Sequence, residues 1–271
     1  MKIRLLLSAA MASILVMLTC NGAMAQSFLF APSSSNVVYA ACYYSDGTPI
    51  PYCNMSLYTG YYPNTGGHFH DDPSHPYSSV TPTSGTSDAS GYLPITINTT
   101  LIGQQEAIEV CDDDHGLCTI YVDGVAYFDL NFLNYPDRMI LVGGNTTMHG
   151  DNNYNHWMTG TASTGIANAA ADYLNVYNPG GTICANDAGL LYGGKFDIND
   201  NWTSPHASHD RGTSVDVAIN YGGQCPNASV VANPNAFLQF CIARGAVQGA
   251  SLVDPGVDVH CNWADPSTYP H

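Results

Sequence analysis

The sequence predicts a multidomain protein in which an N-terminal all-β sandwich is followed by an α+β domain. Residues 37–122 contain short strand-like runs separated by turns rich in Gly, Pro and Asp, which is typical of a small sandwich. The second half alternates two helical periodicities with further strand-like runs, which indicates helices packed on a sheet. The chain has 271 residues, which is enough for two modest hydrophobic cores.

The chain begins with a leader for export. Lys2 and Arg4 precede an apolar run over residues 5–18, and a small-residue Ala-Met-Ala triplet precedes Gln26. These are the three parts of a secretory signal, and the apolar run is too short to span a membrane. We therefore expect residues 1–25 to be a signal peptide and the protein to be secreted or periplasmic, without a membrane span. Cleavage would leave eight cysteines, four before residue 120 and four after 180, which predicts disulfides within each half.

Carboxylates strongly outnumber cations in this chain. It has 22 Asp and Glu residues against 6 Lys and Arg, a net charge of −16. Such a field repels nucleic acid and anionic membranes, so neither is expected as a partner. Glu106 and Glu109 are the only glutamates, and both lie in the first half.

Five strand-like runs make up the sandwich expected over residues 26–125. They cover residues 37–44, 52–58, 93–97, 108–111 and 119–122. The layout, with an Asp-Gly-Thr-Pro turn after the first run, resembles immunoglobulin-like or transthyretin-like modules of exported proteins. Between Cys111 and Cys118 lies an acidic segment, which we expect to be a solvated loop closed by its own disulfide. Calcium binding is the alternative for this loop.

The second domain is expected over residues 136–271. Apolar residues at helical spacing predict a helix over 161–177, which a Pro-Gly-Gly sequence ends. A second helix is expected over 234–244. Strands are expected near 182–185, 189–192, 213–219 and 257–260.

One segment of this domain, residues 205–218, contains the residues best suited to bind a metal ion. His209 and Asp216 flank Gly212, whose freedom to adopt a positive φ lets the two arms of a turn approach each other. Asp216 alternates with valines that would face a core, so its side chain would point to the other face. Imidazole and carboxylate together are ligands for zinc, and His260 is the best-placed third ligand.

The spacing His209-x-x-Gly212-x-Ser214-x-Asp216 resembles the first metal motif of the LAS zinc peptidases. This group includes D-Ala-D-Ala peptidases and penicillin-insensitive murein endopeptidases, and His206 is similar to an extra histidine of the latter. The resemblance implies an LAS-like zinc metallopeptidase domain that hydrolyses peptidoglycan stem or cross-link peptides. His209, Asp216 and His260 would hold Zn²⁺, and zinc-bound water would attack the peptide carbonyl.

The general base of such an enzyme is not settled by the sequence. The family places a glutamate or histidine just before the last ligand, whereas this half of the chain has no glutamate. His206, Asp258 and Asp254 are the candidates, and Asp258 would alternatively orient His260. An aspartate beside a dication has a low pKa, which favours His206 as the base. The missing glutamate leaves room for a non-catalytic cell-wall or surface-binding protein, or for a structural protein whose motif only shapes a turn.

Several other polar residues fit either a site or an ordinary structural role. His68 and His70, with His75 nearby, would suit a second metal ion if they share one strand face, and are otherwise loop histidines. Lys195 and Arg211 would bind a carboxylate or an oxyanion, or would pair with surface aspartates. The same choice between site and structural role concerns Asp187, Asp197, His149 and His156.

Overall fold

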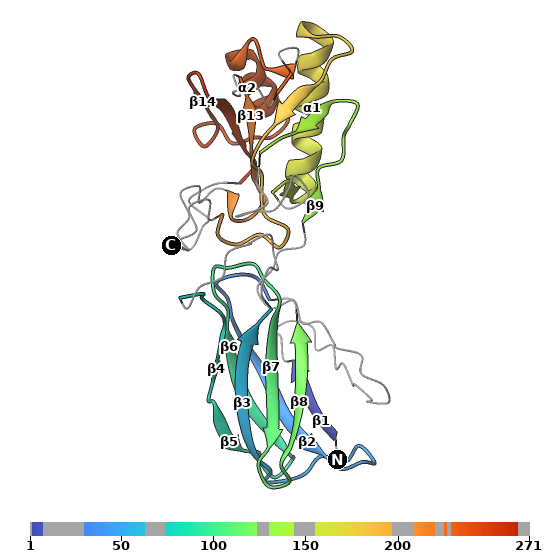
Figure 1. The fold of residues 1–271 in the computed structure, drawn as a ribbon, viewed down its shortest axis with the longest axis vertical. Coiled ribbons are helices and arrows are strands. Elements are labelled where there is room, and N and C mark those ends of the chain that lie inside the picture. Colours follow the sequence, from blue (N-terminus) through green and yellow to red (C-terminus); the bar gives the residue numbers. More distant parts are fainter. Residues whose placement is uncertain are drawn as a thin grey trace. The chain divides into compact units, whose positions relative to one another are not determined.

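The computed structural model describes residues 2–7, 30–62, 74–123, 130–143, 155–196, 209–219, 225–226 and 229–264. The chain divides into two compact units (Figure 1). The first unit joins Met1–Pro63 with Ser74–Tyr127, and the second joins Asn64–Pro73 with Phe128–His271. Each unit has a hydrophobic core of its own.

The first unit is a sandwich of two four-stranded antiparallel sheets. One sheet has the order β1–β2–β6–β4 and the other has the order β5–β3–β7–β8. The strands are β1 (Lys2–Leu7), β2 (Ser35–Tyr43), β3 (Asn54–Tyr61), β4 (Ser79–Thr81), β5 (Ser84–Thr86), β6 (Tyr92–Asn98), β7 (Glu106–Asp112) and β8 (Leu117–Asp123). Strands β2, β3, β6, β7 and β8 correspond to the five predicted runs.

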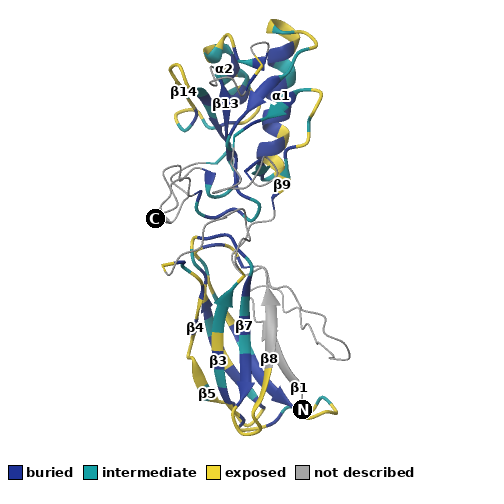
Figure 2. Cartoon of the chain, viewed as in Figure 1, coloured by how far each residue is buried: buried dark blue, intermediate teal, exposed yellow. Residues whose placement is uncertain are grey.

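Alternating residues of the two sheets form the core of the sandwich (Figure 2). Val38 and Ala40 of β2 and Ile95 and Ile97 of β6 are buried on one sheet, and Leu57 of β3 is buried on the other. Along β6 the intervening residues are half-buried or exposed. This period of two is what a sheet with one face on a core requires.

In the full chain, part of the predicted leader forms a strand of this sandwich. Strand β1 pairs antiparallel with β2, from Lys2 opposite Tyr43 to Leu7 opposite Val38. Cleavage of the leader stays a prediction. In a cleaved protein β2 would become the edge strand of its sheet.

Each unit closes its own disulfides, as predicted. The pairs are Cys42–Cys53 and Cys111–Cys118 in the first unit, and Cys184–Cys225 and Cys241–Cys261 in the second. Four disulfides agree with the predicted export of the chain.

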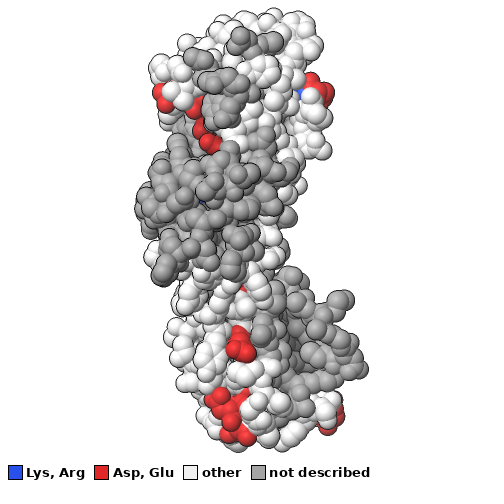
Figure 3. Space-filling model, in the orientation of Figure 1, with Lys and Arg blue, Asp and Glu red and all other residues white. Residues whose placement is uncertain are grey.

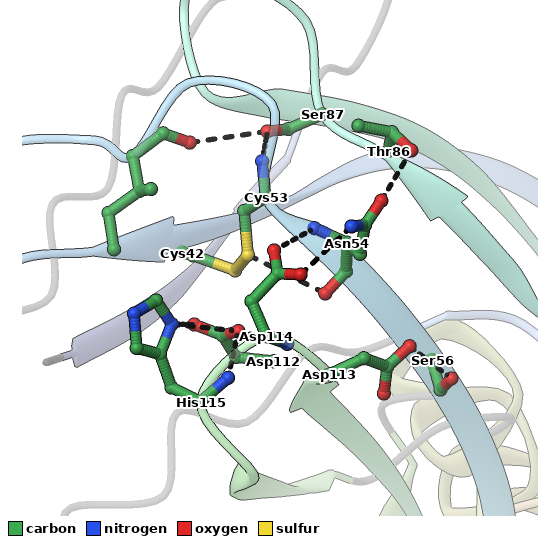
Figure 4. The surroundings of a disulfide bond; sticks show 11 residues. Cys42, Cys53, Asn54, Ser56, Thr86, Ser87, Asp112, Asp113, Asp114 and His115 are labelled. Carbon is green, nitrogen blue, oxygen red and sulfur yellow. Dashed lines mark hydrogen bonds and ion pairs between the residues drawn. A yellow bond between two sulfur atoms is a disulfide. The ribbon is translucent and has the colours of Figure 1, made fainter.

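The acidic segment between β7 and β8 is a tight hairpin whose carboxylates are held by the sandwich (Figure 4). The disulfide closes it as predicted, but Asp112 is fully buried rather than solvated. The hydrogen-bonded pairs are Asp112 with the N–H groups of Asp114 and His115, Asp113 with Ser56, and Asp114 with Asn54. Because protein donors already bind these carboxylates, we do not propose a calcium site here. On the face that Figure 3 shows, carboxylates gather at this end of the unit.

A buried carboxyl group lies at the start of β7. Glu106 is 1% exposed, and its Oε1 accepts hydrogen bonds from the Ser78 N–H (3.0 Å) and from Gln104 Nε2 (2.8 Å). Gln104 Oε1 accepts in turn from His75 Nε2 (2.5 Å), and the His75 ring stacks on Tyr61. Burial raises the pKa of Glu106 and outweighs the hydrogen bonds, which lower it.

Glu106→Gln is expected to flatten the pH dependence of stability. Because the pKa of Glu106 is raised on folding, the folded chain favours the protonated carboxyl group. The resulting stability is fully present below the ordinary pKa and is lost as the pH rises through the raised pKa. Glutamine keeps the acceptor oxygen and does not ionise. Urea unfolding at acidic and neutral pH should show a smaller loss of stability in this variant than in the wild type. Glu109→Gln is the control on the same strand, and equal losses in all three proteins would contradict the prediction.

The second unit contains a five-stranded sheet with the order β10–β12–β13–β15–β14. β10 and β12 run parallel, and the other neighbours run antiparallel. The strands are β10 (Met139–Leu141), β12 (Ile183–Ala185), β13 (Ser214–Ala218), β14 (Leu252–Asp254) and β15 (Asp258–Asn262), and β9 (Asn131–Phe132) pairs separately with β11 (Trp157–Met158).

Two helices belong to this unit. α1 (Gly160–Tyr177) begins after Thr159 and α2 (Pro234–Ala243) begins after Asn233, and both cap residues accept a hydrogen bond from a first-turn N–H. The helices meet through an aromatic contact between Tyr173 of α1 and Phe237 of α2. Neither described helix is long and apolar enough to cross a membrane.

The core of this unit lies between the helices and one face of the sheet. Val215, Val217 and Val259 share this core with α1 and α2, and the Cys241–Cys261 disulfide ties α2 to β15. The alternate residues of β13 and β15 therefore point to the opposite face.

The predicted fold class, a sandwich followed by an α+β LAS-like peptidase domain, is wrong. The described residues contain fifteen strands and only two helices, so the chain is mostly β. Most of the strands that the sequence does not predict (β4, β5, β9, β10, β11 and β14) have two or three residues, too few for a period of two to show. Residues 189–192, expected as a strand, contain an isolated bridge from Gly189 to Trp157.

Candidate metal centre

The register of two strands brings the predicted ligands together. Asp216 of β13 lies directly opposite His260 of β15, and Ala218 lies opposite Asp258. Opposed residues of antiparallel strands point to the same face. Asp216, His260 and Asp258 therefore share the sheet face away from the helices.

His209 reaches this face from the turn that precedes β13. Gly212, at φ +62°, closes the turn by donating its N–H to the His209 carbonyl oxygen (3.0 Å). The His209 ring is fully buried, and its Nδ1 lies 2.6 Å from the Ala188 carbonyl oxygen. Since a carbonyl only accepts, Nδ1 carries the hydrogen. In neutral imidazole the lone pair is then on Nε2, the nitrogen that faces Asp216.

Asp216 lies between the two imidazoles. Its Oδ2 is 3.4 Å from His209 Nε2, and its Oδ1 is 2.7 Å from His260 Nδ1. One donor atom from each of the three residues lies within 4.8 Å of the others. The donor set, two nitrogens and one oxygen with the His209 tautomer already fixed, fits zinc. The side chain of His260 is 15% exposed whereas that of His209 is wholly buried, so His260 is the most exposed of the three ligands.

The charges of the cluster are strongly coupled. Burial raises the pKa of Asp216, but the adjacent His209 and His260 outweigh it and hold that pKa well below its ordinary value. Burial lowers the pKa of His209, but the charges of Asp216 and Asp187 and the bond to Ala188 raise it overall to about 9. A metal ion must therefore displace a proton from His209 at neutral pH.

Asp258 lies two residues before His260 on the same face of β15. Burial, followed by the charges of Asp216 and Asp254, raises the pKa of Asp258 to about 7. Asp254 lies directly opposite Asp258 on β14, which explains part of the repulsion. The low pKa expected from the sequence applies to an aspartate beside a bound dication, and it stays a prediction.

The other predicted site residues differ in where they lie. His206, the second candidate base, lies outside the described residues, as do His68, His70, His149 and Asp197. Lys195 and Arg211 are half-buried near the His209 turn. His75 belongs to the Glu106 network of the first unit, and buried His156 hydrogen-bonds through Nε2 to the Ala185 carbonyl oxygen (3.3 Å).

Two residues near the ligands have little or no signal in the sequence. Asp187 fits a turn as well as a site, yet its charge acts on both His209 and Asp258. Asn155 is fully buried and donates to Asp187 Oδ1 (2.9 Å). Asp187 directly follows the Cys-Ala-Asn end of a strand, where polar residues often serve a site, but nothing in the sequence points to Asn155.

No known family model and no curated protein matches this chain. One similar solved structure is the Yersinia pseudotuberculosis adhesin InvE (11% identity, TM-score 0.30), covering 45% of this chain and 31% of that chain. The D00-D0 domain of intimin (10%, TM-score 0.23) covers 35% of this chain and 41% of that one. The ASH/PapD-like domain of human CEP192 (13%, TM-score 0.25) covers 43% of this chain and 95% of that one. This chain therefore spans less than half the length of the adhesin and intimin structures.

These comparisons contradict the predicted membership of the LAS zinc peptidases. No peptidase family model matches, and the structures reported are adhesin, intimin and PapD-like domains. A short motif such as the one from His209 to Asp216 recurs without common descent, so it does not define a family. The structural likenesses are themselves too weak to indicate what this chain binds.

Proposed function

We propose that this chain is an exported zinc protein whose second unit uses the metal to hydrolyse a peptide bond. The observation that carries this proposal is the convergence of His209, Asp216 and His260, with one donor atom of each within 4.8 Å of the others. Three protein ligands leave a coordination position for water or substrate, which is the arrangement of catalytic zinc sites. Peptidoglycan stem and cross-link peptides, the substrates expected from the sequence, are the ones to test first.

Asp258 is the residue we propose to move the proton. It lies on the ligand-bearing face two residues before His260, and a carboxylate in this position can serve as a general base. When bound, zinc would polarise the substrate carbonyl and make water nucleophilic near neutral pH. Asp258 would accept the proton that the attacking water loses and would return it to the leaving amine. His206 stays the alternative base.

Zinc content and peptide release test this proposal together. Residues 26–271, purified with zinc, are expected to hold one ion per chain and to release peptides or amines from purified cell wall. Asp258→Asn should keep the zinc but lower kcat/KM by about 100-fold or more, the usual effect of losing a general base. Asp137→Asn, which changes an exposed carboxylate of the same unit, is the control and should change neither quantity. If the protein purified with zinc is found to hold none, the proposal is overturned.

A non-catalytic surface-binding protein is the second candidate. It is favoured by the absence of any glutamate after Glu109, because glutamate is the common base of zinc hydrolases and Asp258 would then only orient His260. In this case the wild-type, zinc-loaded protein binds cell-wall fragments without releasing product. Asp258→Asn would then weaken zinc binding rather than turnover.

A further inference from the structure

We infer that Asn155 is a positioning residue of the metal centre, acting through the backbone segment Asn186–Ala188. This inference rests on the proposed zinc site. It assigns a role to a buried side chain that is not itself a ligand and that comes from a distant part of the chain.

The segment Asn186–Ala188, which follows β12, holds two of the three ligands by backbone bonds. The Asn186 N–H donates to the Asp216 carbonyl oxygen (2.7 Å), and the Asp216 N–H donates to the Asp187 carbonyl oxygen (2.8 Å). The Ala188 carbonyl oxygen accepts from His209 Nδ1 (2.6 Å). A shift of this segment would therefore move the Asp216 backbone and release the His209 ring together.

Asn155 holds the same segment from its other side. Its Nδ2 donates to Asp187 Oδ1 (2.9 Å), and its carbonyl oxygen accepts from the Ala188 N–H (2.9 Å). The side chain thus fixes Asp187 while the backbone fixes the residue whose carbonyl selects the His209 tautomer. The Asn155 carbonyl oxygen is therefore two hydrogen bonds away from the ligand His209, with Ala188 between them.

The burial of Asn155 favours a positioning role over a stabilising one. The residue is fully buried, yet no described residue hydrogen-bonds to its Oδ1. Burying an amide costs stability unless its polar atoms are hydrogen-bonded, and among the described residues only Asp187 bonds to this side chain. The Asp187 backbone is hydrogen-bonded to Asp216, and the Asp187 charge acts on His209 and Asp258. The amide donor is therefore explained by holding that carboxylate in place.

Variants at this position should fold, because the neighbouring bridge does not involve the side chain. Trp157 and Gly189 exchange two backbone hydrogen bonds (2.9 and 3.0 Å) directly beside Asn155 and Ala188. Asn155→Leu keeps the branching and the number of side-chain heavy atoms and removes the donor, whereas Asn155→Asp places a second carboxylate against Asp187. Asn175→Ala, on the exposed side of α1, is the matched control.

Zinc affinity and the His209 ring hydrogen test the inference. We expect Asn155→Leu and Asn155→Asp to bind zinc about 10- to 100-fold more weakly in chelator competition, with circular dichroism unchanged. Asn175→Ala should bind like the wild type. In the metal-free protein, the Nδ1–H resonance of His209 should be sharp and downfield in NMR spectra of the wild type, and exchange-broadened in both Asn155 variants.

The two measurements separate this inference from the proposed function. If the wild type binds no zinc, the proposed function fails, and the Nδ1–H resonance still decides the role of Asn155. If Asn155→Leu shows the wild-type resonance, the inference is overturned whatever the zinc affinity. Unchanged zinc affinity in this variant, with a wild type that binds zinc, would overturn it as well.

Discussion

Replacing Asp216 by alanine is expected to remove most of the bound zinc. The carboxylate is one of three donors, and it also lies between the two imidazoles at 3.4 and 2.7 Å from their nitrogens. Its loss removes a ligand and the group that orients the other two. The affinity should therefore fall by more than about 100-fold, the upper range for losing a partner of a ligand alone. Elemental analysis and chelator competition would measure this.

The wild-type site should also bind zinc more tightly as the pH rises. The carboxylates raise the pKa of His209 to about 9, so a proton occupies this ligand at pH 7. Displacing one proton makes the apparent affinity rise about tenfold per pH unit until the pH reaches the pKa. Asp137→Ala, which removes an exposed carboxylate, is the control for both predictions. It should keep the wild-type zinc affinity and the wild-type increase of that affinity with pH. An affinity that does not change between pH 6 and 8 would contradict a site built on His209.

Gly212→Ala is expected to destabilise the second unit for two separate reasons. Gly212 has φ +62°, and an added Cβ would lie 2.9 Å from the Leu130 side chain and from the Trp157 carbonyl oxygen. A left-handed conformation costs an alanine about 1–2 kcal/mol, and overpacking adds about 1–3 kcal/mol. We therefore expect a loss of about 2–5 kcal/mol in urea unfolding.

A second glycine separates the two causes. Gly256 has φ +81°, but an added Cβ would meet no atom within 4 Å. Gly256→Ala should therefore show only the conformational cost, about 1–2 kcal/mol. If both variants lose the same stability, close approach at Gly212 is not the reason. Because Gly212 closes the turn that carries His209, its replacement should weaken zinc binding as well, whereas that of Gly256 should not.

Local patterns were enough to predict how Asp216 is presented. The alternation of Val215, Asp216 and Val217 predicts that Asp216 points to the face opposite the valines, and the structure has this arrangement, with all residues of β13 buried. The juxtaposition of Asp216 and His260 could only be guessed. It depends on the register between β13 and β15, which are separated by a helix and another strand, and long-range pairing leaves no local signal.

The supporting residues were beyond prediction for a related reason. Asn155 acts through tertiary hydrogen bonds to Asp187 and Ala188, and an isolated asparagine has the same sequence signal as a loop residue. The prediction of the fold class was wrong because many of the strands are short. Strands such as β10 and β14 are defined by their neighbours in the sheet and leave no pattern of their own. The two helices show a clear periodicity, so the sequence predicts helices more readily than these strands.

After Cys20, the four disulfides join consecutive cysteines, from the pair Cys42–Cys53 to the pair Cys241–Cys261. A chain secreted from its N-terminus presents each cysteine to the oxidising side before any later one emerges. In each of these four pairs, the first cysteine therefore meets its native partner as the next thiol to arrive, and no other cysteine lies between the two. Such a chain can mature with an oxidant alone, without an isomerase that reshuffles wrong pairs.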